Sequence, residues 1–481
     1  MLQTLKNAWK TKELRSKIIF TLFILLLYRI GTVIPVPFVS ANAFAGQFNG
    51  TILAQMDILS GGSLSSATIF ALGVSPYINA SIIIQLLAVV FPRLGELAKN
   101  DKEKMNFITR IVTVILAIVT AVGYYFLLKN GTNGQSALTN AADPAQNPGM
   151  AWFYGIVIVA CYCAGASVIM WLGELINKHG IGNGISMILF ANIVSTLPSF
   201  IYKLVTLAIG TYTYSEKAWL YGIVSTVFAL LVIVSLVALF IFVIWVTGSE
   251  RRIPITYAKR VVGRKMYGGQ SSNLPIKLNM TGVMPIIFAS SIVSLIPTIL
   301  MLCGVDGTKD TFWHGAYRVL GSNGVVYPIC LFLLIIAFAY FYTQITFDPI
   351  EVSNNIKKQG GTIPGIRQGR PTSDYIRKIL NKVTLVGALF LGIVAVLPVI
   401  AGPHIFQHLI EWILAGDKAS IVYGNYILYG NSVTTVEQAA SSVSSKLTFG
   451  GTSILIIVGV VIETFRGLES ELTMRNYKGF L

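Results

Sequence analysis

Few residues in this chain have the types and spacing that catalysis requires. The run Gly180-Ile181-Gly182-Asn183-Gly184 is similar to the glycine-rich loop of dinucleotide-binding domains. Such a loop needs a strand before it and an acidic residue about 20 positions later. An apolar stretch long enough to cross a membrane precedes this one instead. We therefore expect a tight turn at 180–184.

The residues that commonly bind metals are scattered. The four histidines (His179, His314, His404 and His408) do not combine with the four cysteines at the spacing of a zinc site. The sequence also shows no P-loop, no nucleophile elbow and no pair of carboxylates in a predicted pocket. We predict that the chain is not an enzyme and that it uses no cofactor and no metal.

The polar residues that stand out lie inside an apolar stretch, 61–87. Gly73 and Pro76 interrupt it, and Asn79 and Gln85 place amides within it. In lipid, backbone groups freed by such breaks must be satisfied by protein or water, so irregular backbone occurs beside a protein-lined cavity. The pattern predicts a half-helix followed by a helix that lines a pore.

The composition indicates a membrane protein. Of 481 residues, 54% are hydrophobic and only 12% are charged, against roughly 25% charged residues in a soluble domain. The length accommodates about ten spans of roughly 20 residues. We place them at 18–34, 61–87, 108–128, 151–175, 185–207, 218–246, 280–302, 325–347, 379–401 and 447–465.

Basic residues predict the orientation. Of the 36 lysines and arginines, 26 lie in the tails 1–17 and 466–481 and in the connections on their side. Six lie in the opposite connections, and a seventh, Lys203, lies near the outer end of the predicted span 185–207. The positive-inside rule therefore places both termini in the cytoplasm. Two basic loops, 247–277 and 348–378, are then cytoplasmic. A long connection, 402–446, with a possible surface helix at 405–414, is external.

Ten spans divide into two halves of five, 18–207 and 218–465. An odd number of spans per half inverts the second half relative to the first, as in proteins with a site or pore at the membrane midplane. The second span of each half is interrupted, by Gly73 and Pro76 in one and by Pro285 and Pro297 in the other. We thus predict an all-α polytopic fold of ten transmembrane helices, in two inverted five-helix halves around a central pore.

Two other functions fit this architecture. An inverted-repeat solute transporter coupled to protons or sodium usually carries ionisable groups in mid-span, and spans two to ten have none near their centres. The lack of ionisable groups in mid-span does not exclude a uniporter or a structural membrane scaffold. Arg29 lies near the outer end of span one, where it can snorkel to the interface, so we assign it a structural role.

The chain contains several long and distinctive motifs: YRIG at 28–31, IPVP at 34–37, SGGSLSSATIFALGVSPYINASIIIQLL at 60–87, GIGNGIS at 180–186, RRIPITYAKR at 251–260, LPIKLNMTGVMPIIFASS at 274–291 and PGIRQG at 364–369. They resemble those of the SecY/Sec61-alpha family, the central subunits of protein-conducting channels. The resemblance implies an hourglass pore that moves unfolded secretory polypeptides outward and releases apolar helices sideways into lipid. Connection 402–446 is longer than the family's pattern and has no assigned role.

The resemblance also implies pore residues. An apolar ring would comprise Val74, Ile78, Ile82, Ile185, Leu189, Ile287 and Ile456. A movable plug, about 52–65, would centre on Ile58, Leu59, Gly61, Gly62 and Leu64. An apolar ring suits a pore that passes any polypeptide, because it offers no selective hydrogen bonds and excludes ions by dewetting. Ordinary packing residues remain the alternative for the ring.

The resemblance further implies a lateral gate and docking surfaces. Gln85 and Asn279 would face each other across the gate, although bonds within a helix or to water remain open. A SecA motor or a ribosome would dock on Arg251, Arg252, Lys259, Arg260 and Arg367. Orientation of the chain and contact with lipid headgroups are the competing explanation for these charges.

The family implies several partners. They are the SecE and SecG subunits, the SecA motor ATPase, the ribosome, the unfolded preprotein with its signal sequence, and the lipid bilayer. The implied location is the bacterial cytoplasmic membrane, which the chain crosses several times with both termini on the cytoplasmic side.

Overall fold

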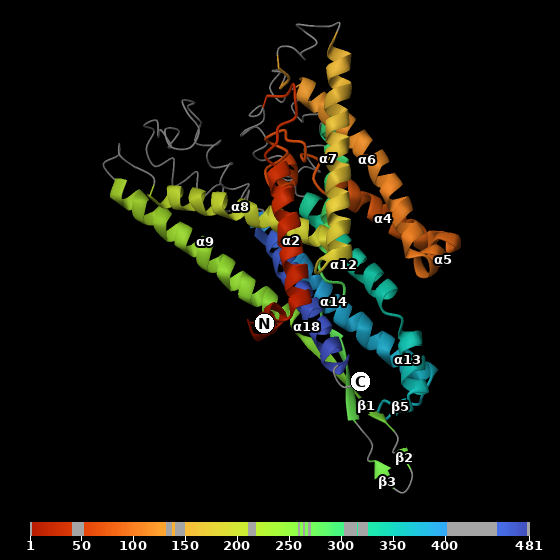
Figure 1. Ribbon diagram of the computed structural model, residues 1–481. Coiled ribbons are helices and arrows are strands. Elements are labelled where there is room, and N and C mark those ends of the chain that lie inside the picture. Colours follow the sequence, from red (N-terminus) through yellow and green to blue (C-terminus); the bar gives the residue numbers. More distant parts are fainter. Residues whose placement is uncertain are drawn as a thin grey trace.

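The computed structural model describes residues 2–40, 52–130, 137–139, 150–209, 218–257, 260–262, 265–267, 271–302, 315, 326–401 and 450–478. Connection 402–446, with the predicted surface helix 405–414, lies outside them. Ten long helices occur in the described part, one for each predicted span (Figure 1). They are α2 (Lys12–Gly31), α4 (Ser75–Val90), α6 (Lys102–Asn130), α7 (Ala151–His179), α8 (Gly184–Ile209), α9 (Ala218–Thr247), α10 (Met284–Leu302), α12 (Val326–Thr346), α14 (Arg370–Ala401) and α18 (Gly450–Lys478).

Four shorter helices accompany them: α1 (Leu2–Lys10), α3 (Ile52–Leu59), α5 (Pro92–Asn100) and α13 (Pro349–Lys358). Within the described residues, six helices are long and apolar enough to cross a membrane, or seven if α4 and α5 count as one bent span. The α4–α5 pair bends by 118° at Phe91–Pro92, where proline disfavours helical backbone in the residue before it.

The second predicted span differs from the expectation over 61–74. The half-helix expected there is a run of turns, and helix α4 starts only at Ser75. Gly61, Gly62 and Gly73 all have positive φ, from +56° to +86°, which a right-handed helix does not accept. Serine side chains also bond nearby backbone, as Ser63 does to the Ser60 carbonyl, and such bonds compete with helix.

The helices enclose one large apolar core. Its members come from both predicted halves, and they include Ile78 of α4, Ile188 of α8, Ile335 of α12 and Leu455 of α18. The outer surface is apolar as well: Trp245 of α9 is 71% exposed. A contiguous apolar exterior is what a bilayer solvates. The chain is therefore a multi-pass membrane protein.

The helix neighbours explain where the centre lies. Helices α4, α6 and α7 pack in sequence, as do α10, α12 and α14. Between these groups α4 packs on α10, and α8 packs on α18. The two interrupted spans, α4 and α10, thus meet at the middle of the molecule, as expected for a functional centre between repeats.

Strands appear in the basic loops, where we predicted none. Strands β1 (Glu250–Tyr257), β4 (Ser271–Lys277) and β5 (Gly361–Thr362) form a small antiparallel sheet in the order β4-β1-β5. Strands β2 (Arg260–Val262) and β3 (Lys265–Tyr267) form a hairpin beyond it. Because β5 belongs to loop 348–378, the pairing of Thr256 with Thr362 joins the two loops. They lie at the end of the molecule that carries both termini (Figure 1); we call it the basic end.

Several helices continue past the predicted spans at the basic end. Helix α18 runs to Lys478, although we predicted a tail from residue 466. Its extension packs against the N-terminal segment, where Ala8, Leu14, Ile181 and Leu468 form a small core. Lys17 adds an ion pair to Glu471 at 2.9 Å. These contacts with the N-terminal segment and with Ile181 stabilise the polar C-terminal extension of α18 as a helix.

The run 180–184 forms the expected tight turn between α7 and α8. Gly182 has φ +76°, and the Asn177 side chain accepts a hydrogen bond from the Gly184 amide at 2.7 Å. A Cβ on Gly184 would lie 1.9 Å from the Gly173 carbonyl oxygen. Close helix packing therefore explains the glycines that resemble a nucleotide loop.

This contact predicts a difference between two glycine substitutions. Gly184→Ala should destabilise the protein by about 1–3 kcal/mol because the new methyl group overpacks the α7–α8 contact. Gly467→Ala is the control, since it lies in α18 with nothing within 4 Å of its Cβ position. It should stabilise by about 0.5–1 kcal/mol. Thermal unfolding of the purified protein in detergent measures both, and equal midpoints would contradict the packing argument.

Candidate functional site

Hydrogen bonds hold the middle of the irregular stretch 60–74 in place. The Tyr124 hydroxyl of α6 donates to the Leu64 carbonyl at 2.5 Å. The Val36 amide donates to the Ala67 carbonyl at 3.1 Å, and the Ile69 amide donates to the Ile34 carbonyl at 3.0 Å. These bonds satisfy backbone groups that an apolar environment would leave costly. They hold in place the segment that leads into α4.

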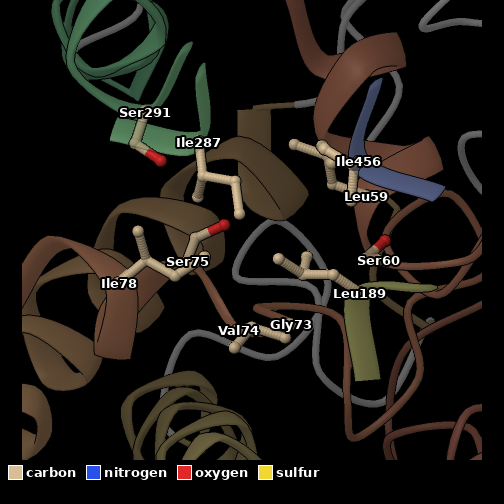
Figure 2. A pocket seen from close by; sticks show the side chains of 10 residues that line it. All are labelled: Leu59, Ser60, Gly73, Val74, Ser75, Ile78, Leu189, Ile287, Ser291 and Ile456. Carbon is tan, nitrogen blue, oxygen red and sulfur yellow. The ribbon is translucent and has the colours of Figure 1, made fainter. Parts of the chain in front are cut away.

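A small cavity lies in front of α4 (Figure 2). Its lining residues are Leu59, Ser60, Gly73, Val74, Ser75, Ile78, Leu189, Ile287, Ser291 and Ile456. They come from α3, α4, α8, α10, α18 and the turns before α4. None of the ten is ionisable, and the few polar groups are hydroxyls and backbone.

Five predicted ring residues line this cavity: Val74, Ile78, Leu189, Ile287 and Ile456. We call these five the collar. Their side chains, from separate elements, surround the cavity (Figure 2), and none is more than 7% exposed. An apolar constriction of this kind blocks ions by dewetting.

The other two predicted ring residues do not line the cavity. Ile82 and Ile185 are buried in the same core, one helical turn away from Ile78 and Leu189. A Cβ on Gly173 would lie 2.5 Å from the Ile185 Cδ1 atom, so Ile185 packs against α7. In this structure Ile82 and Ile185 are therefore packing residues, the alternative given above for the ring.

The predicted plug residues fall into two groups. Leu59, at the end of α3, enters the cavity beside Ile456 (Figure 2), and Ser60 follows it. Ile58 is half-buried. Leu64 instead belongs to a second core with Tyr124 and Tyr162. Gly61 and Gly62 lie between the two groups, with φ +72° and +86°.

Gln85 bonds across the contact between α4 and α12, which we call the seam. The Tyr342 hydroxyl of α12 donates to Gln85 Oε1 at 2.5 Å, and Gln85 Nε2 donates to Ser81 Oγ within α4 at 2.8 Å. No hydrogen bond joins Gln85 to Asn279, whose Oδ1 is buried without a partner. The sequence did not point to Tyr342, because one tyrosine among the aromatic residues of an apolar span carries no distinguishing signal.

The predicted docking residues lie at the basic end. Arg251 and Arg252 of β1 are exposed, as is Arg367. Arg260 begins β2, and Lys259 lies outside the described residues. Arg252 bonds to Glu250 at 2.8 Å. At the sheet's base, burial lowers the pKa of the Lys277 ammonium, and the nearby Arg466 lowers it further.

The backbone around Arg367 is held in place. The Thr372 hydroxyl donates to the Arg367 carbonyl at 2.8 Å, and Gln368 Nε2 donates to the Gly361 carbonyl at 3.1 Å. Gly365 and Gly369 have φ +81° and +95°, which permits the turns on either side. The guanidinium is therefore presented by a rigid loop, which reduces the entropy lost on binding.

Sequence reasoning missed several residues at the centre. Ser60, Ser75 and Ser291 line the cavity. Asn192 of α8, three residues beyond Leu189, donates from Nδ2 to the Leu59 carbonyl at 2.7 Å. An amide within an apolar span indicates a functional position, so the sequence did contain a signal for Asn192. In the described part of the chain, no three histidine, cysteine or carboxylate side chains are grouped to hold a metal ion.

An apolar cavity within a helical bundle, which Leu59 of the preceding segment helps to line, is typical of a membrane channel. A family model described as SecY matches residues 68–465. The chain is 39% identical over 491 residues to the protein translocase subunit SecY of Streptomyces coelicolor, covering 100% of both chains. It is also 39% identical over 498 residues to that subunit of Mycobacterium tuberculosis. The chain belongs to the SecY family.

Solved structures share the fold. One, described as a protein conducting channel, has a TM-score of 0.56 at 18% identity, over 95% of this chain and 92% of that chain. Another, Sec61 in a canine ribosome-channel complex, has a TM-score of 0.53 at 17% identity, over the same shares. The fold class predicted from the sequence, ten helices around a central pore, is therefore confirmed.

The Tyr342–Gln85 bond predicts how the seam responds to its removal. Tyr342→Phe should increase the population with α4 and α12 apart, since such bonds contribute about 0.6–2 kcal/mol in a membrane. Spin labels at the exposed positions Ile83 and Ile345 would report a broader distance distribution. The control is Tyr340→Phe, whose hydroxyl bonds to the Asn381 carbonyl of α14. An unchanged distribution in Tyr342→Phe would remove this bond as a determinant of the seam.

Proposed function

We propose that the chain forms a gated channel that conducts unfolded secretory polypeptides across a membrane and releases apolar helices sideways into lipid. It is a channel and not an enzyme. The observation that carries the proposal is the collar, five apolar side chains around one cavity with Leu59 of the plug segment 52–65 inside it. A channel that passes polypeptides of any sequence must bind none of these polypeptides strongly. An apolar wall meets that requirement.

The gate follows from the contacts of α4. This helix supplies Ile78 to the collar and also packs on α10 of the other half. One hydrogen bond, from Tyr342 to Gln85, crosses from α12. Apolar packing has no preferred partner in lipid, so an apolar helix from the pore can replace it. The seam and the neighbouring contact of α4 with α10 are therefore the proposed lateral exit. Gln85 provides a polar group there, and Asn279 lies just before α10.

The basic end supports the proposed orientation and location. Both termini and the β-sheet lie at this end (Figure 1), and Arg367 follows β5 of that sheet. The positive-inside rule makes this end cytoplasmic. The location is then the bacterial cytoplasmic membrane. The proposed partners are SecE and SecG subunits, a SecA motor and a ribosome, whose phosphates would attract Arg251, Arg252, Lys259 and Arg260. The Sec61 structure in a ribosome-channel complex makes the ribosome a reasonable partner here.

The solute-transporter alternative has no specific support. A transporter's site would need polar or ionisable groups for its solute and coupling ion, and the cavity is lined by aliphatic side chains and three serines. Family membership also favours the channel, so we retain a single function.

Polar substitution in the collar should open the channel to ions. With Ile78→Ser and Ile287→Ser combined, conductance in planar bilayers should rise by at least about tenfold, because hydroxyls stabilise water in the constriction. The control combines Ile83→Ser and Ile296→Ser on exposed faces of the same helices. It should conduct as the unmodified protein does. Equal conductance of the two double variants would contradict the collar's role.

Charge reversal at Arg367 should separate the two transport modes. Arg367→Glu should lower SecA-driven translocation into vesicles by about tenfold or more, since a hydrogen bond to a charged group contributes roughly 1.5–3 kcal/mol. Ribosome-dependent insertion of membrane helices should fall less. Arg15→Glu changes the net charge equally on the exposed N-terminal segment and serves as the control. Normal rates in both assays for Arg367→Glu would remove this residue from the docking surface.

A further inference from the structure

Two side chains from different helices donate to carbonyls at the end of the plug segment. Asn192 Nδ2 of α8 donates to the Leu59 carbonyl at 2.7 Å. Arg29 Nη1 of α2 donates to the Gly61 carbonyl at 3.3 Å. Leu59 is the residue that enters the cavity. These bonds therefore hold the backbone that positions the cavity's occupant.

The chain around Gly61 leaves no room for a side chain. A Cβ there would lie 2.9 Å from Asn192 Oδ1 and 3.0 Å from Arg29 Nη1. At Gly62 a Cβ would have nothing within 4 Å. Both glycines have positive φ, so both suit the turn. Only Gly61 also lets the two donors approach the backbone.

The next residues of the chain are anchored independently. Leu64 accepts from the Tyr124 hydroxyl, and Ala67 and Ile69 pair with the segment after α2. The anchored part and the held part therefore meet at Gly62 and Ser63. Movement of α3 with Leu59 requires rotation near Gly62 and loss of the Asn192 and Arg29 bonds. It also breaks short-range bonds across the turn, such as that from the Ser65 amide to Asp57 Oδ1.

Asn192 is suited to a contact that forms and breaks. It is 0% exposed, and a buried hydrogen bond in an apolar setting is stronger than one in water. Its Oδ1 makes no hydrogen bond of good geometry, and the Asn192 side chain also interacts with the buried Tyr28 hydroxyl. Arg29, by contrast, is exposed and its bond is long. We therefore rank Asn192 as the principal donor and Arg29 as the auxiliary one.

We propose that Asn192 and Arg29 form a latch that holds the plug segment in the closed channel. This inference rests on the proposed function, because a latch has meaning only if Leu59 leaves the cavity during transport. It assigns to Arg29 a gating role beside its structural one. It also makes Asn192 a positioning residue, which acts on the pore through the Leu59 backbone.

The test measures how often the plug segment leaves the cavity. The purified channel would carry Ile58→Cys, with the four native cysteines replaced, and would be reacted with a water-soluble maleimide in vesicles. Asn192→Leu removes the donor at similar volume. Labelling and ion conductance should rise about 2- to 10-fold, the effect of losing one hydrogen bond. Arg29→Gln should give a smaller rise.

The controls use the same helix and the same turn. Ser195→Ala removes a hydroxyl that bonds only to the Asn192 carbonyl of its own helix, and it should leave labelling unchanged. Gly61→Ala should raise labelling more than Gly62→Ala, because only the first displaces Asn192 and Arg29. This pair tests the latch from the plug side should Asn192→Leu fail to fold.

The outcomes separate the latch from the channel. Labelling and conductance of Asn192→Leu equal to those of the unmodified protein, or an equal effect of the two glycine variants, would overturn the latch. The channel would stand in that case if the collar variant still conducts and the unmodified protein still moves a precursor. Absence of both activities would overturn the proposed function and the latch with it.

Discussion

The structure depends on how the irregular backbone of residues 60–74 is satisfied within apolar surroundings. Each carbonyl or amide outside a helix needs a partner there, because no water or lipid group can replace it. The Tyr124 hydroxyl and the backbone around Val36 provide partners, and the Asn192 amide bonds to the Leu59 carbonyl just before this stretch. With these bonds in place, α4 starts late, at Ser75, and its first turns face the cavity. The collar exists because this stretch is not a helix.

The residues around the cavity combine two kinds of interaction with different consequences. Aliphatic packing among α4, α8, α10 and α18 keeps the collar together and tolerates rearrangement, since it has no directional requirement. Single hydrogen bonds, from Asn192 to the Leu59 carbonyl and from Tyr342 to Gln85, are directional and few. Each can be lost at a cost of the order of 1 kcal/mol. The proposed gate requires many apolar contacts and few hydrogen bonds, because an interface with many hydrogen bonds would not open.

The basic end shows why two long polar loops can act together. The pairing of β1 with both β4 and β5 links the two loops through Thr256 and Thr362, which are 106 positions apart in the chain. Ile253, Ile276 and Ile376 give the sheet a core of its own against α14. Exposed arginines on this support are held at defined positions, which makes recognition of a partner less costly in entropy than from flexible loops.

The sequence determined the membrane class, the number of spans, the position of the interrupted spans and most of the collar. These features follow from hydropathy, glycine and proline positions, and motifs, which are local. Long-range contacts decided the rest: that Gln85 meets Tyr342, that Ile82 and Ile185 pack beside the cavity, that Asn192 holds the plug segment, and that polar loops form a sheet. Partners in each case lie far apart in the chain, and one hydrogen bond or methyl contact leaves no periodic pattern. Only folding, which selects among many compatible neighbours by geometry, brings these groups together.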